Sequence, residues 1–346
     1  MANVKAKRNV YLVMVILTFI VYQVTLYQYQ NVIPTFTRNI SPANFLSAYN
    51  TISVTPHPFV VAARLKERRD RMRKECGEVD HPKTIAKALA RILYAPSHDM
   101  FVCASPKAGS STWIHHLNNM AGFNPPNGNL HTKYWISNVR ARKVLGMKEA
   151  ESRLTSSVNV MIARHPFARF VSAFRDKFAD GRRLDKPQSH GHYSLFWKPA
   201  LRSLNRNISG PLQINFTEFT TFAMKTRKQD PHWTPLTNMC SPCDISYEYI
   251  LFLETFNEDI NFLVNKLNIT KINLEIRRNY KSNGTVPRPR EGVGPYDDLL
   301  TLDPNLLQYY LQLPPHLMAQ VIHYYALDLK LLGFQVPPVL TSFTTF

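Results

Sequence analysis

An apolar run, a polar loop and a helical pattern follow one another between residues 100 and 121. The run MFVCA (100–104) is typical of a short buried strand. The pattern STWIHHLNNMA (111–121) is typical of a helix, which Ser or Thr can cap. The loop SPKAGSSTW (105–113) joins the two. A strand, a tight loop and a helix N-terminus in this order favour an anion, because backbone N–H groups are unsatisfied there and the helix dipole is positive.

The side chains of this loop suit a phosphate or a sulfate. Gly109 lets the backbone approach an anion closely, and Lys107 supplies a positive point charge. The loop does not follow the Walker A pattern, in which the lysine comes after the last glycine and a Ser or Thr then holds magnesium. An ATP- or GTP-dependent P-loop enzyme is therefore disfavoured, and a polar turn without a ligand is the alternative. Hydroxyl hydrogen bonds can come from Ser110, Ser111 and Thr112.

A second strand, turn and helix follow between residues 158 and 178. VNVMIA (158–163) is typical of a buried strand, and PFARFVSAFRDKF (166–178) of a helix with proline in its first turn. Arg164 ends the strand and Ser172 lies inside the helix, so an arginine fork and a hydroxyl can share one phosphate. Surface charge is the alternative for Arg164, Arg169 and Arg175. The apolar residues that fall on one face of this helix are Phe167, Phe170, Val171, Phe174 and Phe178.

The alternation of strands and helices continues along the chain. YILFLE (249–254) is typical of a third strand, NEDINFLVNKL (257–267) of a helix, and residues 315–334 of a terminal helical stretch. This alternation predicts an α/β domain with a central, mainly parallel sheet flanked by helices. Two anion sites in one such domain suit a ligand with two separated phosphate groups.

These two elements resemble the nucleotide-binding elements of sulfotransferases, which use 3′-phosphoadenosine 5′-phosphosulfate (PAPS). PKAGSSTW (106–113) is similar to the loop for the 5′-phosphosulfate, and RHPFARFVSAFRDKF (164–178) to the element for the 3′-phosphate. HWTPLTNMCSPCDISYEYILFLETFNED (232–259) and YYALDLKLLGF (324–334) resemble, in the right order, segments of one Golgi family. This is the carbohydrate sulfotransferase family that includes the chondroitin and dermatan 4-O-sulfotransferases. The resemblance runs from about residue 98 to the C-terminus.

The resemblance implies a P-loop-like sulfotransferase fold and transfer of the sulfuryl group of PAPS to a glycan hydroxyl, without a metal. The acceptor it implies is a chondroitin/dermatan-type glycosaminoglycan. Lys107 is expected to stabilise charge on the transferred group, and Arg164 and Ser172 to fix the 3′-phosphate. The residues expected to bind PAPS are Pro106, Lys107, Ala108, Gly109, Ser110, Ser111, Thr112, Arg164 and Ser172.

The implied reaction also needs a base that takes the proton of the acceptor hydroxyl. His232 is the first choice for this catalytic role, because it begins the HW motif that resembles the family. The alternatives are His115, His116, His131 and Glu254.

The loop departs from the family pattern PKVACTNWKR. Gly109 and Ser110 replace Ala-Cys, and Ile114 and His115 replace the basic pair after the tryptophan. The missing charge leaves the acceptor preference open if that end of the loop faces the substrate. Two other functions stay open: a catalytically silent glycan- or nucleotide-binding protein of the same fold, and a membrane-anchored P-loop kinase.

The charge of the chain indicates a polyanionic partner. Lys plus Arg number 42 and Asp plus Glu 24, which gives a formal net charge of +18. Nucleic acid, an anionic membrane surface and an acidic polysaccharide all fit this balance. The segment 277–290, RRNYKSNGTVPRPR, is a basic candidate for contact with a glycosaminoglycan or N-glycan acceptor, with a solvated loop as the alternative.

The N-terminal segment favours the polysaccharide. VYLVMVILTFIVYQVTLY (10–27) is long and apolar enough to span a bilayer, and Lys5, Lys7 and Arg8 precede it. The positive-inside rule then predicts a type II anchor with the body in the lumen of the Golgi. A cleaved signal peptide is disfavoured, since no small-residue cleavage site follows the apolar core. A luminal body disfavours nucleic acid, and N-glycosylation sequons at Asn39, Asn207, Asn215, Asn268 and Asn283 agree with it.

The predicted organisation has four parts: a cytosolic tail (1–9), a transmembrane signal-anchor (10–27), a luminal stem (28–80) and a catalytic domain (81–346). Within the stem, the charged run AARLKERRDRMRKE (62–75) is expected to form a solvated helix that joins stem and domain, with contact to an acidic polymer as the alternative.

Four cysteines agree with an oxidising lumen. Cys76, Cys103, Cys240 and Cys243 can form two disulfides with three possible pairings. The pair CSPC (240–243) can also be half of a zinc site, but no second Cys/His pair with matching spacing occurs, so disulfides are favoured.

Overall fold

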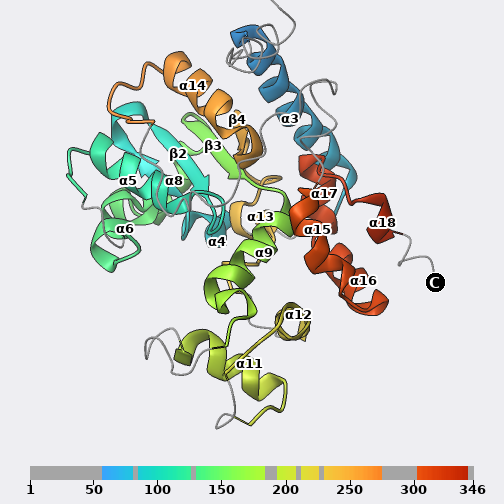
Figure 1. Cartoon of the computed structure of the whole chain (residues 1–346). Helices are drawn as coiled ribbons and strands as arrows, with labels where there is room; N and C mark the ends of the chain where they lie inside the picture. The colour runs from blue at the N-terminus through green and yellow to red at the C-terminus, as the bar shows by residue number, and fades with distance from the viewer. Residues whose placement is uncertain are drawn as a thin grey trace, which may run out of the picture. The chain divides into compact units, whose positions relative to one another are not determined.

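A four-stranded sheet lies at the centre of the fold (Figure 1). The strands β1 (Leu93–Ala95), β2 (Met100–Ala104), β3 (Val158–Ala163) and β4 (Tyr249–Phe252) follow one another in the order β1-β2-β3-β4. β1 runs antiparallel to β2, whereas β2, β3 and β4 are parallel. The computed structural model describes residues 57–80, 85–125, 130–183, 193–207, 212–225, 230–274 and 302–341.

The predicted strands and helices are largely confirmed. The third strand ends earlier than predicted, at Phe252, because Leu253–Thr255 turns into a 3-10 helix, η4. The terminal helical stretch divides at Tyr325, whose backbone leaves helical geometry and whose buried hydroxyl donates to the Trp233 carbonyl at 2.5 Å. The α-helices are α3 (Pro58–Glu78), α4 (Ile85–Leu89), α5 (Ser110–Met120), α6 (Lys133–Val139), α7 (Ala141–Val144), α8 (Met147–Arg153), α9 (Pro166–Lys177), α11 (Lys198–Ser203), α12 (Phe216–Lys225), α13 (Leu236–Cys240), α14 (Phe256–Lys266), α15 (Pro304–Leu311), α16 (Pro315–Tyr324), α17 (Ala326–Leu332) and α18 (Pro338–Thr341). The short 3-10 and π elements are η1 (Pro96–His98), η2 (Ala179–Gly181) and η3 (Tyr193–Trp197).

Both faces of the sheet are buried, as is usual for parallel strands. Alternate residues of β2 point to opposite sides, so Phe101 packs in one core and Val102 in the other. The core that contains Phe101 takes in the apolar face of α9, and all five residues predicted for that face are buried. The core that contains Val102 takes in α5 and α14. The chain therefore forms an α/β domain in three layers.

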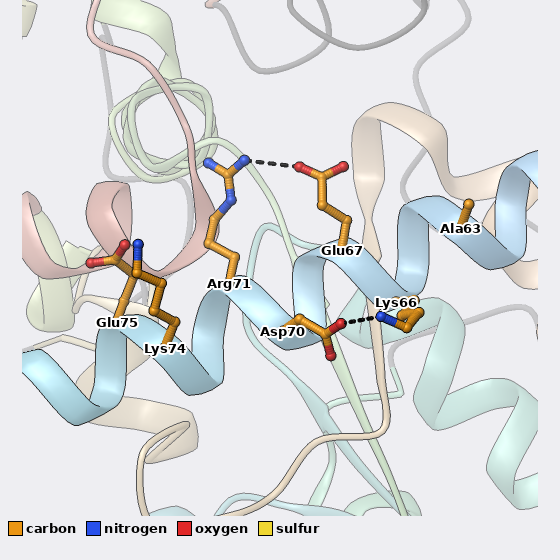
Figure 2. Close-up of a pocket in the computed structure, with 7 residues that line it drawn as sticks. All are labelled: Ala63, Lys66, Glu67, Asp70, Arg71, Lys74 and Glu75. Atoms are coloured by element: carbon orange, nitrogen blue, oxygen red, sulfur yellow. Dashed lines mark hydrogen bonds and ion pairs between the residues drawn. The ribbon is translucent and has the colours of Figure 1, made fainter. Parts of the chain in front are cut away.

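Helix α3 corrects the prediction of a solvated joining helix at the end of the stem. It lies against β4, α14 and α17 (Figure 1), within the compact unit Pro56–Phe346. Arg64 and Arg68 are only 4% and 6% exposed, and each forms a 2.6 Å ion pair with the buried carboxylate of Asp259. The charged run thus has two faces: buried arginines bind the domain, and the outer face carries the pairs Lys66–Asp70 and Glu67–Arg71 (Figure 2).

The four cysteines form two disulfides, Cys76–Cys243 and Cys103–Cys240. The first ties the end of α3 to the loop after α13, and the second ties β2 to α13. This confirms the preference for disulfides over zinc and selects one of the three pairings. No group of three or more His, Cys, Asp or Glu residues suited to a metal occurs in the described part of the chain.

Several predictions fall outside the described residues. They are the tail (1–9), the anchor (10–27), the first part of the stem, the basic segment 277–290, and the sequons at Asn39 and Asn283. Within the ranges that the structure describes, no helix is long and apolar enough to cross a membrane. The sequon asparagines Asn207, Asn215 and Asn268 are exposed.

Candidate functional site

The loop after β2 has a backbone shaped for the start of a helix. Lys107 and Gly109 have φ angles of 67° and 85°, both in the left-handed region, and the Ala108 N–H donates to the Ser105 carbonyl at 3.1 Å. A Cβ added to Gly109 would meet only Leu253 Cδ1, at 3.9 Å. Glycine is therefore favoured at position 109 by the left-handed backbone conformation, and not by a lack of room for a side chain.

The first turn of α5 follows this loop directly. Gly109 is its N-cap and has no side chain to accept from the N–H groups of that turn, which leaves the positive end of the helix for another acceptor. Trp113 is fully buried and anchors the turn in the core. Ser110 and Thr112 are 8% and 7% exposed, and the Ser111 hydroxyl lies 2.7 Å from His131 Nε2.

Lys107 points toward α9. Its Nζ lies 3.2 Å from Asp176 Oδ2, and the same oxygen lies 3.0 Å from Lys177 Nζ. Burial lowers the pKa of Lys107, while the carboxylate of Asp176 favours the charged ammonium. Burial raises the pKa of Asp176, but the charges of Lys107 and Lys177 outweigh it and hold the value at about 2. Two cations thus share one carboxylate, which leaves net positive charge beside the loop.

His232 forms a pair with Asp230. Its Nδ1 lies 2.6 Å from Asp230 Oδ1, and its backbone N–H donates to the same oxygen at 2.9 Å. Burial raises the pKa of Asp230, whereas the hydrogen bonds from His232 lower it. An ionised carboxylate accepts and does not donate, so Nδ1 carries a proton, and in the neutral form of the ring Nε2 is then the acceptor.

A chain of contacts links the pair to Lys107. Lys177 bridges from Asp176 to the ring of Phe196, with Nζ 5.0 Å from the ring centroid. Phe196 packs edge-on against His232, with ring centroids 5.6 Å apart. His131 lies close enough to both ends of this chain of contacts for their charges to act on it. Desolvation lowers the pKa of His131 most, and the charges of His232, Lys177 and Lys107 lower it further. The loop, the end of α9 and the 230–232 turn thus form one positively charged site.

Arg169 fixes the turn that bears His232. Its side chain is fully buried and donates from Nη1 to the His232 carbonyl at 3.1 Å and from Nη2 to the Thr234 carbonyl. Its charge also acts on Asp328, whose carboxylate accepts from the N–H groups of Leu236 and Thr237 at the start of α13. Surface charge is therefore the wrong interpretation for Arg169, though it holds for the exposed Arg175.

Arg164 joins the two predicted phosphate elements. Its Nη1 donates to the Lys107 carbonyl at 3.1 Å, so the end of β3 touches the loop after β2. Burial lowers the pKa of Arg164, and the charge of Glu254 opposes this shift. Glu254 itself is engaged through Oε1, which accepts the His165 N–H at 2.9 Å.

Residues 90–335 match the sulfotransferase family. The chain belongs to the sulfotransferase family. Mouse carbohydrate sulfotransferase 8 is 24% identical over 286 residues, which cover 79% of this chain and 64% of that protein. Zebrafish carbohydrate sulfotransferase 14 is 25% identical over 295 residues, covering 81% of this chain and 74% of its own length. Rat carbohydrate sulfotransferase 10 is 24% identical over 297 residues, covering 80% and 77%.

The resemblance inferred from the motifs is thus confirmed at the level of carbohydrate sulfotransferases. The chain spans less than two thirds of the length of the first relatives it matches: 64% of the mouse protein, and 42% and 46% of human carbohydrate sulfotransferases 8 and 9. No solved structure matches the chain.

The structure brings several of the predicted site residues together. Lys107, Gly109, Ser111, Arg164 and His232 surround the site described above, and His131 joins them through Ser111. Ser172 lies half-buried in α9 and makes no hydrogen bond to any described residue. The remaining predicted loop residues, Pro106, Ala108, Ser110 and Thr112, form the backbone and first turn of the same loop.

Two of the alternative bases lie inside α5. His115 and His116 are 4% and 2% exposed, and the ring of His116 packs against Trp113. Ile114 is likewise only 4% exposed. The positions at which the sequence departs from the family after the tryptophan are therefore buried.

Proposed function

We propose that this chain is a PAPS-dependent carbohydrate O-sulfotransferase whose acceptor is a chondroitin/dermatan-type glycosaminoglycan. The names of its relatives support the carbohydrate, and the positive charge of the chain supports an anionic one. One observation carries the proposal: Lys107, beside the start of α5, and the Asp230–His232 pair lie in one charged site.

The donor side of the site fits a phosphosulfate. The N-cap of α5 has no side-chain acceptor of its own, and Lys107 and Arg164 place two cations at the loop. When bound, PAPS supplies a sulfuryl group attached to a phosphate leaving group. The ammonium of Lys107 balances negative charge that grows on the leaving oxygen, and the first-turn N–H groups of α5 do the same from the helix end.

The acceptor side of the site fits a general base. With Nδ1 held by Asp230, His232 Nε2 is free to take the proton of the attacking hydroxyl. The imidazolium that forms is stabilised by the adjacent carboxylate, as in other carboxylate-oriented histidines. His131 is the second candidate for the base, since its ring also lies at the loop.

We further propose that residues 10–27 anchor the chain in the Golgi membrane, with the domain in the lumen. The apolar run, the basic residues before it and the sequons behind it support this placement. A luminal domain meets glycosaminoglycans during their synthesis, which agrees with the proposed acceptor.

The test is donor binding and sulfate transfer by the purified full-length chain. Calorimetry with PAPS measures binding, and radiolabelled PAPS measures transfer to chondroitin, dermatan, desulfated heparin and N-glycans. The variants Lys107→Ala and Arg164→Ala are expected to lose both. Lys266→Ala, an exposed lysine of α14, is the matched control and is expected to retain both. Absence of PAPS binding by the wild-type chain would refute the proposal, and binding without transfer to any acceptor would favour the catalytically silent alternative.

A further inference from the structure

Three arginines gather beside the edge strand β1. Arg140 forms an isolated antiparallel bridge with Leu93, the first residue of β1, and donates from Nη1 to the Ala90 carbonyl at 2.9 Å. Arg91 follows Ala90 directly, and Arg142 lies in α7. We call Arg91, Arg140 and Arg142 the β1-edge basic patch.

The β1-edge basic patch has no acidic counterpart in the described part of the chain. None of its members forms an ion pair there, and Arg91 and Arg142 are exposed. Burial and then the charges of Arg91 and Arg142 lower the pKa of Arg140 to about 10, and no carboxylate acts in the opposite direction. The outer face of α3 is different, because Lys66 and Arg71 pair there with carboxylates one helical turn away (Figure 2). Mutual repulsion in the patch is relieved when an anion binds.

The register of the sheet places this patch at the same end of the sheet as the loop 105–109. β1 is antiparallel to β2, and Leu93 pairs with Val102 near the carboxyl end of β2. The residues before Leu93 therefore lie level with the end of β2, from which the loop 105–109 departs. Ligands of open α/β sheets bind at this end of the strands.

Helix α6 connects the loop to the patch. It packs on α5, with Asn118 Nδ2 donating to the Trp135 carbonyl at 3.1 Å and Asn138 Nδ2 to Asn118 Oδ1 at 3.2 Å. His131, which contacts Ser111, lies just before α6, and Arg140 follows it directly. Seven helical residues span about 10 Å. The charge of Arg140 reaches His131, so positive potential continues from Lys107 past His131 to the patch.

We infer that the β1-edge basic patch binds anionic groups of the acceptor chain outside the sugar that is sulfated, so that the acceptor is recognised as a polyanion. This inference rests on the proposed function. The occupant is chosen by charge complementarity. Three guanidiniums that form no ion pair with any described residue lie beside the site, and they suit carboxylate or sulfate groups repeated along a glycan. An anionic membrane surface is the competing partner, and the experiment distinguishes the two.

The experiment compares two charge-reversed pairs in the full-length chain. The patch variant is Arg91→Glu with Arg142→Glu, which leaves Arg140 in place because it holds the Ala90 carbonyl. The matched control is Lys266→Glu with Lys271→Glu, two exposed lysines near β4 at the opposite edge of the sheet. Fluorescence anisotropy measures binding of a labelled chondroitin sulfate chain at low and high salt. Calorimetry measures PAPS binding, and sedimentation measures binding to phosphatidylserine vesicles.

We expect the patch variant to bind the chondroitin sulfate chain roughly tenfold more weakly than the control at low salt, from two exposed charge contacts. The difference is expected to shrink as salt rises, and PAPS binding to stay unchanged. Transfer to carboxyl-reduced, desulfated chondroitin, which is neutral, is expected to be equal in the two variants.

Two results would overturn the inference. One is equal binding of the chondroitin sulfate chain by the patch variant and the control. The other is a loss confined to phosphatidylserine vesicles, which would assign the patch to a membrane surface. Failure of the wild-type chain to bind PAPS is distinguishable from both, because it would overturn the proposed function and with it the acceptor role of the patch.

Discussion

Replacing Arg169 by lysine tests how the turn that bears His232 is held. The guanidinium of Arg169 donates to two backbone carbonyls, those of His232 and Thr234, and it is fully buried. Hydrogen bonds from a charged group each contribute about 1.5–3 kcal/mol. Lysine keeps the charge that faces Asp328 but is a point donor without the planar fork, so it can replace one of the two bonds. The expected loss in the free energy of unfolding is therefore about 1.5–3 kcal/mol.

The functional consequence is expected in kcat. Loosening the 230–234 turn moves the Asp230–His232 pair relative to Lys107, and misplacement of a base by about 1 Å can cost on the order of a hundredfold in rate. PAPS binding is expected to remain, since the loop after β2 does not depend on Arg169. Urea unfolding gives the stability, and transfer kinetics with calorimetry separate kcat from donor binding.

The matched control is Arg175→Lys, on the exposed side of the same helix. Arg175 pairs with Asp180 at 3.3 Å and is 54% exposed, so its replacement is expected to change stability by less than about 0.5 kcal/mol. An unchanged unfolding midpoint for Arg169→Lys would refute the energetic reasoning. A destabilised variant with a wild-type kcat would show that Arg169 has a structural role alone.

Three further predictions concern the loop, its counter-ion and the disulfides. Asp176→Asn is expected to lower the pKa of Lys107 further. It is also expected to lower the free energy of unfolding by about 1 kcal/mol, a figure that allows for screening by solvent because Asp176 is 44% exposed. Because the pKa of Asp176 is depressed to about 2, this contribution is present above the ordinary pKa near 3.8 and is lost as the pH falls toward 2, which acid unfolding of both proteins would show. Gly109→Ala is expected to cost about 1 kcal/mol because of its φ of 85°, and to weaken PAPS binding measured by calorimetry; unaltered affinity would contradict the loop assignment. Cys76→Ser with Cys243→Ser removes a bridge that, with Cys103–Cys240 intact, closes a path of about 30 residues, so thermal unfolding is expected to show a loss of about 3–4 kcal/mol; a loss below about 1 kcal/mol would contradict this estimate.

The three parallel strands and the helices after them were predictable because their signals are local. Each strand is an apolar run, interrupted only by Asn159 in β3, and the spacing of the phenylalanines of α9 directly indicates the buried face of that helix. β1 has only three residues and no periodic pattern, so nothing in its own sequence marks it as an edge strand. α3 was recognised as helical, but its packing was not, because the carboxylate that pairs with Arg64 lies 195 residues away in the sequence.

The site was predictable only in part, because several of its residues also have partners that are distant in the sequence. Lys107 and Arg164 stand at strand ends, where the fold class itself directs attention. Asp176, Lys177 and Asp230 are charged residues without a distinguishing local pattern. Their place in the site becomes visible only in the folded structure, where α9 and the 230–234 turn lie beside the loop after β2. Arg169 was open to a surface interpretation because its two acceptors lie 63 and 65 residues further along the chain.

Lys107 and its loop are proposed to serve sulfate transfer to a carbohydrate. The most direct measurement is the initial rate at which radiolabelled sulfate passes from PAPS to desulfated chondroitin, for the wild-type chain and for Lys107→Ala. We predict measurable transfer by the wild type and a loss of at least about a hundredfold in the variant, since Lys107 supplies charge at the leaving oxygen. Equal rates in the two proteins would contradict this role of Lys107.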